Sequence, residues 1–359
     1  MTSRDFGIYI LTYPGDFHLS CVLVRSIQHV NPDIPIMIIP GEGFDRHDHP
    51  FEVPIMPQPG GFWAHMGYMD RCFWAFQGPF ENFLYLDADM ICTKSLENLK
   101  RRITQQQGNF VYVHPSISDE DWLTLIHDPN HPERQRYARH VKREIGRGPL
   151  NEFDPDYNIF ANYPFNAGLF ASRRLVLTES DFVSLNRAET NFYRNVLKKN
   201  WTWKSSDLFF RDQGRLNYLI SKLSIPTFHL RPDLICLAGA SAIQVSFDRV
   251  ARDSCDFHLI HWMGSMSPSP SWFCVKPLFA VYACLWSAVG QRTGRWMAPE
   301  YHRLPESPGY SLWRHYYEQS YGAMPLGERL RWSWRHLKRV CKLAIRWLKL
   351  SIRDADSRA

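Results

Sequence analysis

The sequence predicts an α/β protein with a Rossmann-like architecture: a mostly parallel sheet covered by helices on both faces. Two observations lead there. Apolar strands alternate with amphipathic helical segments along the first 86 residues, an order that favours parallel pairing. The third apolar run then ends in two carboxylates, Asp87 and Asp89. With 359 residues, 45% hydrophobic and 22% charged, the chain has the composition of a globular protein of one large domain or two ordinary ones.

Each element of this pattern has its own local signal. "FGIYIL" at 6–11 is a continuous apolar run, as expected of a buried strand. Apolar residues at helical spacing predict a helix over 17–30. "IPIMIIP" at 34–40 predicts the second strand, 65–76 predicts a second helix, and "NFLYL" at 82–86 predicts the third strand. Open sheets of this kind bind ligands at the carboxyl ends of their strands, where Asp87 lies.

Beyond the third strand the pattern weakens and then returns. Residues 114–164 are polar and rich in Pro and His, and we interpret them as an insertion that forms a lid or acceptor wall. A helix with a Ser-Asp start is expected over 205–223, and "FHLIHWMG" contains a further short strand. We therefore expect a catalytic domain over 1–280 and a helical C-terminal region over 281–359.

Two carboxylates one residue apart at a strand end suit a hard divalent cation. Mg²⁺ and Mn²⁺ take oxygen ligands and keep coordination positions for water or phosphate. An alternative is that Asp87 and Asp89 are solvated turn residues. Another is a phosphatase of the haloacid dehalogenase type, with Asp87 as nucleophile; there a Thr or Val usually stands where this chain has Ile91.

Four motifs in order resemble the glycosyltransferase family 8 type of the GT-A fold. They are "LYLDADMICTKSLENL", "PFNAGLFASRR", "RDQGRLNYLI" and "HLIHWMG". The resemblance implies a UDP-sugar donor, a bound Mn²⁺ or Mg²⁺ and transfer with retention at the anomeric carbon. It implies that Asp87, Asp89 and His261 hold the metal. Taken alone, His261 would be a core histidine.

The resemblance also assigns the donor sugar site. Asn166 matches a residue that contacts the donor sugar, and Asp212 and Gln213 match a pair beside it. A carboxylate orients sugar hydroxyls, whereas an amide can sit by the anomeric carbon without blocking departure of the leaving group. The alternatives are a kink at a strand edge for Asn166 and the polar face of a solvated helix for Asp212 and Gln213.

Contacts to the nucleotide are expected from several other segments. Thr12 and Tyr13 follow the first strand, where the family contacts uracil and ribose, and Tyr13 could stack on the base. Arg71 matches a basic residue near the sugar or diphosphate, although a solvated surface arginine is the alternative. Gly264 ends the late HxxG motif, and Lys276 is expected to contact the diphosphate. Here the family usually continues into Lys-Pro-Trp within a few residues, whereas "SMSPSPSWFCVKP" places Lys276 on a longer loop.

The C-terminal segment 327–353 differs in kind from the rest of the chain. It combines one apolar helical stripe with many basic residues, a pattern typical of helices that bind anionic membrane surfaces. The stripe comprises Leu330, Trp334, Leu337, Cys341, Ala344 and Leu348. The alternative is a helix docked on the catalytic domain. Nucleic acid is not expected as a partner, because no binding motif accompanies the charge.

Together these features predict a metal-dependent hexosyltransferase that acts on a glycan or lipid-linked acceptor. We expect it in the cytoplasm, peripheral on the inner face of the cell membrane. The N-terminus has no signal-peptide pattern, no window has the about 20 apolar residues of a membrane span, and the eight cysteines contain no CxxC pair. The competing class is a nucleotide-sugar-binding scaffold without turnover.

Overall fold

The computed structural model describes the core of the chain and scattered positions near its end. Described are residues 4–13, 17–44, 53–67, 70–105, 109–113, 145–146, 149–158, 165–200, 208–209, 211–230, 235–237 and 258–261, with single positions between 128 and 139 and between 315 and 345. Gly264, Lys276 and most of the 114–164 insertion lie outside these residues.

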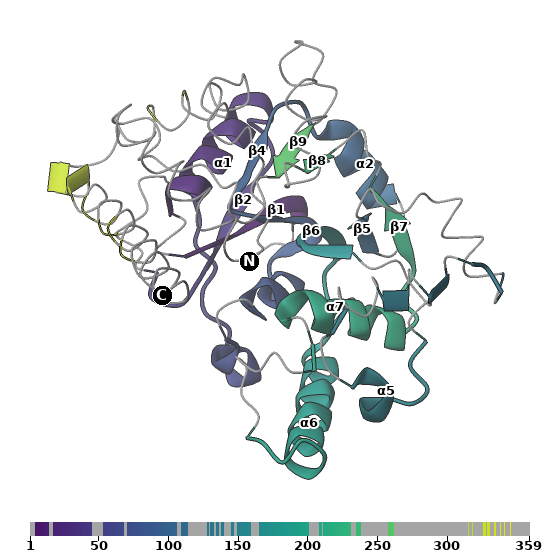
Figure 1. Cartoon of the computed structure of the whole chain (residues 1–359). Coiled ribbons are helices and arrows are strands. Elements are labelled where there is room, and N and C mark those ends of the chain that lie inside the picture. The colour runs from purple at the N-terminus through teal and green to yellow at the C-terminus, as the bar shows by residue number, and fades with distance from the viewer. Residues whose placement is uncertain are drawn as a thin grey trace, which may run out of the picture.

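A six-stranded mixed sheet forms the centre of the molecule (Figure 1). Strand β1 pairs in parallel with β2 and β3, β5 pairs in parallel with β7, and β6 runs antiparallel between β3 and β5. The strand order is β2 (Ile36–Pro40), β1 (Arg4–Thr12), β3 (Phe80–Asp87), β6 (Phe165–Arg173), β5 (Asn109–Val113) and β7 (Thr227–His229). The predicted α/β class with a mostly parallel sheet is confirmed, and β6 is the antiparallel exception.

Helices cover both faces of this sheet (Figure 1). Alternation along β1 separates the faces: Ile8 and Ile10 pack with helices α1 (Phe17–Val30) and α2 (Glu97–Gln105), whereas Tyr9 and Leu11 face the opposite layer. That opposite layer consists of the 3-10 helix η3 (Asp70–Gln77) and helices α6 (Glu179–Asn195) and α7 (Arg211–Lys222). Two apolar clusters therefore enclose the sheet.

A small second sheet begins directly after the carboxylates. It consists of β4 (Met90–Cys92), β9 (Leu259–His261) and β8 (Ile235–Leu237), with β4 and β9 antiparallel and β8 and β9 parallel. All three residues of β4 are buried, and α1 packs against this strand. The second sheet therefore joins the region after the third predicted strand to the last strand of the predicted catalytic domain.

Several element boundaries differ from the prediction, among them those of two helices and of the third strand. The helix expected over 65–76 is instead the 3-10 helix η3, which begins only at Asp70, and a separate 3-10 helix, η2 (Gly61–His65), ends where the prediction began. Over so short an apolar stretch, residue spacing does not distinguish the 3-10 repeat from the α repeat. The helix expected from 205 begins at Arg211, after bends at Leu208 and Phe209, both of which are buried. The third strand is longer than expected and includes Asp87.

Other described features lie away from the carboxylates. The described part of the insertion includes the short helix α5 (Leu150–Phe153). All described positions from 315 to 345 are helical, and among them Leu326, Leu330, Trp334 and Ile345 are exposed. In the described part of the chain, no helix combines the length and hydrophobicity needed to cross a bilayer.

Candidate metal and donor-sugar site

Asp87 and Asp89 lie at the carboxyl edge of the main sheet because of how β3 ends. Residues 82–86 of β3 are buried, so the strand passes through the core before Asp87 emerges beside Leu11 of β1. Ala88 and Asp89 then form a turn, and the chain re-enters the interior as β4. The tight turn between two buried strands holds both carboxylates on one short segment.

His261 reaches these carboxylates through strand pairing. Strands β4 and β9 are antiparallel, and Met90 pairs with His261. Nε2 of His261 lies 3.1 Å from Oδ1 of Asp89. One ligand atom from each of Asp87, Asp89 and His261 lies within 4.8 Å of the other two. The structure therefore brings together the three residues that the sequence assigned to a metal.

Gly168 closes one side of this group. Leu86 of β3 pairs with Leu169 of β6, which places Gly168 beside Asp87. A Cβ atom at Gly168 would lie 2.6 Å from Oδ2 of Asp87, and 3.0 Å from both Oδ1 of Asn166 and Cε1 of His261. The absence of a side chain at this position thus provides the space in which the three residues meet. The Asn166 side chain is held here, since its Oδ1 accepts a hydrogen bond of 2.7 Å from the Gly168 N–H.

The donor atoms of this group fit a hard divalent cation. Two carboxylates supply oxygen ligands, and the imidazole of His261 supplies nitrogen. Burial by itself lowers the pKa of His261, but the neighbouring Asp89 and Asp87 outweigh it and raise the pKa above its ordinary value. An environment that favours a positive charge on the imidazole is one in which a cation would also be stabilised.

Asp212 faces the same region from the start of α7. Burial raises the pKa of its carboxyl to about 8, and the charges of Asp70 and Asp87 add to this effect. Sγ of the buried Cys72 lies 4.0 Å from Oδ2 of Asp212 as a weak hydrogen-bond donor. The neighbouring Gln213 is buried. Gln213 is therefore not on a solvated helix face, whereas Asp212 is partly exposed.

Asn217 fixes α7 to β6 and so relates Asp212 to Asn166. Its Oδ1 accepts a hydrogen bond of 3.0 Å from the N–H of Phe165, and its Nδ2 donates to the Phe165 carbonyl at 2.9 Å. The same Nδ2 donates to the Gln213 carbonyl at 2.8 Å. One buried amide thus connects the first residue of β6 with the first turn of α7.

A buried ion triad, which the sequence analysis did not predict, holds together the helices that carry Asp212 and Gln213 and their neighbours. Arg215 donates to Glu189 at 3.0 and 3.2 Å and to Asp70 at 3.1 and 3.3 Å. Arg215 is only 1% exposed. The triad joins η3, α6 and α7, three elements far apart in sequence. The available signal was an arginine three residues after Asp212 and directly before the apolar positions Leu216 and Leu219 of the same helix.

Thr12, Tyr13 and Arg71 gather at the ends of β1 and β2. Nη1 of Arg71 donates to the Pro40 carbonyl at 2.8 Å. Burial lowers the pKa of Arg71, and the charge of the nearby Tyr13 acts in the opposite direction. Thr12 is buried, and its hydroxyl has no hydrogen-bond partner among the described residues. These three predicted nucleotide contacts thus share one edge of the sheet with Asp87, the edge where the sequence placed the site.

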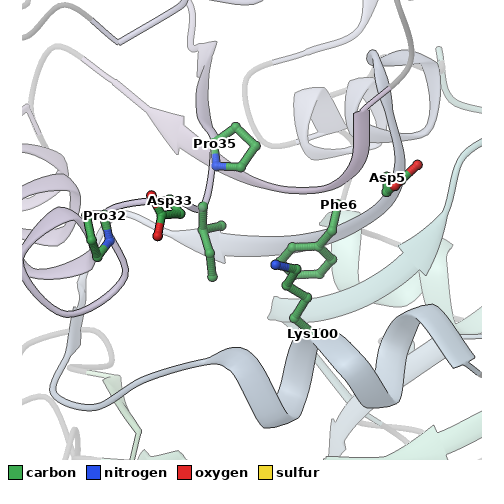
Figure 2. Close-up of a pocket in the computed structure, with 7 residues that line it drawn as sticks. Asp5, Phe6, Pro32, Asp33, Pro35 and Lys100 are labelled. Atoms are coloured by element: carbon green, nitrogen blue, oxygen red, sulfur yellow. The ribbon is translucent and has the colours of Figure 1, made fainter.

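A surface hollow of about 490 Å³ lies at the other end of β1 and does not include these residues (Figure 2). Phe6 near the start of β1, Asp33 and Pro35 before β2, and Lys100 of α2 line it. It is at the amino ends of the strands, where an open α/β sheet does not normally bind its ligand. The candidate site is therefore the cluster of Asp87, Asp89 and His261 and not this hollow.

Solved structures similar to this chain are glycosyltransferases. The galactosyltransferase LgtC, in complex with donor and acceptor sugar analogs, matches 77% of this chain and 94% of its own, with 14% identity and a TM-score of 0.44. The bifunctional glycosyltransferase WbbM matches 73% of this chain and 46% of its own, with 12% identity and a TM-score of 0.43. Mouse xyloside xylosyltransferase 1 matches 74% and 100%, with 9% identity and a TM-score of 0.40.

No protein-family model matches the sequence, and no curated protein does either. The structural neighbours are thus the kind of protein that the four motifs led us to expect, whereas membership of family 8 stays a prediction. At TM-scores of 0.44 and lower, these likenesses carry no argument about substrate or mechanism. Both have to come from the site itself.

Proposed function

We propose that this protein is a metal-dependent glycosyltransferase that moves a hexose from a UDP-sugar to a hydroxyl of a glycan or glycolipid, with retention at the anomeric carbon. The observation that carries the proposal is the convergence of Asp87, Asp89 and His261, whose ligand atoms lie within 4.8 Å of one another at the carboxyl edge of the sheet. Neither solvated turn aspartates nor an isolated core histidine would require this convergence.

Asp87, Asp89 and His261 would hold Mn²⁺ or Mg²⁺. When bound, the cation would supply positive charge to the diphosphate and so stabilise the departing UDP. Carboxylates and water suit both ions, and the single imidazole favours Mn²⁺, the softer of the two. Lys276 and Gly264, outside the described residues, are proposed to complete the diphosphate contacts.

The nucleotide would lie over the ends of β1 and β2. The buried hydroxyl of Thr12 has no partner among the described residues and would bond a polar edge of uracil or ribose. Tyr13 would stack on the base. Arg71, held in place by the Pro40 carbonyl, would add a positive charge on the side of the sugar or diphosphate.

Asn166, Asp212 and Gln213 would bind the donor sugar. Burial and the charges of Asp70 and Asp87 raise the pKa of Asp212 to about 8 in the ligand-free protein, and its carboxyl would hydrogen-bond a hydroxyl of the donor sugar. The proposed mechanism is retention without a protein nucleophile, in which the leaving diphosphate guides the incoming hydroxyl. An inverted anomer in the NMR spectrum of the first product would remove this part of the proposal.

The C-terminal region is proposed to bind an anionic membrane surface at the inner face of the cell membrane. Leu326, Leu330 and Trp334 are exposed at spacings of four residues, so they share one side of the helix. Lys338 lies 5.3 Å from the Trp334 ring and adds positive charge beside this side. A membrane location would favour a lipid-linked acceptor, and residues 281–359 would then be a membrane-binding unit attached to the catalytic domain at 1–280.

Release of UDP from UDP-hexoses, with and without Mn²⁺, tests the proposed activity. We expect Mn²⁺-dependent UDP release that is lost on Asp87→Asn. A protein that binds UDP-hexoses but releases no UDP with any sugar or acceptor would instead be a scaffold. Release of inorganic phosphate from phosphomonoesters, with a phosphorylated Asp87, would indicate the phosphatase.

A further inference from the structure

Tyr85 lies directly behind the metal-binding carboxylates on β3. It precedes Asp87 by two residues, so the two side chains are on the same face of the sheet. Its ring is fully buried and stacks on Phe170, the paired residue of β6, with centroids 4.8 Å apart. The position of the phenol is therefore set by the core and not by solvent.

The hydroxyl of Tyr85 donates a hydrogen bond of 2.8 Å to Oδ1 of Asp87. A phenol keeps its proton at neutral pH, so the Tyr85 hydroxyl is the donor in this contact. The sequence analysis assigned no role to Tyr85. Its hydrogen bond restricts rotation of the Asp87 carboxylate.

The two oxygens of Asp87 consequently have different surroundings. Oδ1 faces the Tyr85 hydroxyl, whereas Oδ2 points to the space beside Gly168, where a Cβ would lie only 2.6 Å away. The same missing Cβ would lie 3.0 Å from Cε1 of His261. Oδ2 is thus the oxygen on the side of the imidazole.

We propose that Tyr85 is a positioning residue that holds the Asp87 carboxylate in one orientation and presents Oδ2 to the cation. The inference rests on the proposed function, since it takes Asp87 as a metal ligand. Residues that orient metal ligands through a hydrogen bond typically contribute about 10–100-fold to metal affinity. Tyr85→Phe removes the hydroxyl and keeps the ring on Phe170.

Tyr9 provides a matched control. It is the residue paired with Tyr85 on β1, it is fully buried, and it belongs to the same apolar cluster. Its hydroxyl accepts a hydrogen bond of 3.2 Å from the N–H of Phe80 and does not contact Asp87. Tyr9→Phe therefore removes the same atom from the same layer of the core without touching the carboxylates.

The test is Mn²⁺ binding to the full-length protein, measured by electron paramagnetic resonance as the loss of the signal of free Mn²⁺. We expect Tyr85→Phe to weaken Mn²⁺ binding by about tenfold or more. Tyr9→Phe should stay within about twofold of wild type, and thermal unfolding of both variants reports any general loss of stability.

Two outcomes would overturn the inference, and they differ. Equal Mn²⁺ affinity of Tyr85→Phe, Tyr9→Phe and wild type would remove the role of Tyr85 and leave the metal site standing. Failure of the wild-type protein to bind Mn²⁺ would remove the metal site, and the role of Tyr85 with it.

Discussion

Nε2 of His261 lies 3.1 Å from Oδ1 of Asp89, although the two residues are far apart in the sequence. The antiparallel pairing of β4 with β9 produces this contact, because it places His261 opposite Met90, the residue after Asp89. Assembly of the proposed metal site therefore depends on the second sheet, and not only on the DxD segment at the end of β3.

Gly168→Ala should weaken metal binding. The added methyl would lie 2.6 Å from Oδ2 of Asp87 and 3.0 Å from Cε1 of His261, so at least one proposed ligand has to move. We expect Mn²⁺ affinity to fall by about tenfold or more, in the range seen when the supporting contacts of metal ligands are removed. Gly60→Ala is the control, because no atom lies within 4 Å of its added Cβ. Unchanged Mn²⁺ affinity of Gly168→Ala would contradict the geometry of the site.

Asp212→Asn should stabilise the metal-free protein increasingly as pH rises. Burial, with Asp70 and Asp87 nearby, raises the pKa of Asp212 from 3.8 to about 8, so the folded protein retains a proton that the unfolded chain loses. The stability that the Asp212 carboxyl contributes to the wild type is therefore present at low pH and is lost as pH rises from about 4 to 8. The loss is on the order of several kcal/mol.

Urea unfolding in the presence of EDTA, from pH 4 to 9, measures this effect. The difference in free energy of unfolding between Asp212→Asn and wild type should grow across the window and then level off. Asp33→Asn is the control, since the side chain of Asp33 is exposed. A difference that does not vary with pH for Asp212→Asn would show that its carboxyl is not perturbed.

Removing Arg215 should strongly destabilise the fold. Arg215→Met leaves the carboxylates of Asp70 and Glu189 buried without their cation, a change that costs about 3–5 kcal/mol. Arg173→Met breaks the partly exposed pair with Glu81 and should cost less than about 1 kcal/mol. Chemical denaturation compares the two. Combining Arg215→Met with Asp70→Asn and Glu189→Gln should recover part of the loss, and equal effects of the two single variants would refute the buried triad.

Leu330→Glu with Trp334→Glu should reduce binding to vesicles that contain anionic lipid. Both side chains are more than half exposed on the C-terminal helix, and insertion of apolar residues supplies much of the affinity of interfacial helices. Cosedimentation with phosphatidylglycerol vesicles measures this, and wild-type binding should weaken as salt rises. Leu223→Glu, at an exposed position after α7, is the control. Equal binding of the double variant and wild type would indicate that this side of the helix does not contact lipid.

Local patterns predicted the parts of the fold that depend on neighbouring residues. Helix α1 spans the predicted 17–30, because its apolar residues repeat at helical spacing along its whole length. Strand β1 and the carboxylates at the end of β3 were equally visible. His261 was found through its resemblance to a known motif, since no local spacing connects it to Asp89.

The remainder depends on contacts between distant residues. The hydrogen bond from Tyr85 to Asp87 requires that both side chains lie on the same sheet face beside β6, and the sequence contains no separate signal for it. The Arg215 triad joins three elements whose packing cannot be inferred from one helix. The 3-10 helix η3 likewise packs between the sheet and α7, and no local pattern in the sequence indicates these contacts.

Calorimetric titration of UDP into the full-length protein, with and without Mn²⁺, tests the central claim most directly. Wild type and Asp89→Ala are compared, because Asp89 belongs to the proposed metal site and lies in the turn between β3 and β4 rather than in a strand. The proposed site predicts UDP binding that requires Mn²⁺ in wild type and is lost in Asp89→Ala. No UDP binding by wild type under either condition, or Mn²⁺-dependent binding that survives in Asp89→Ala, would contradict it.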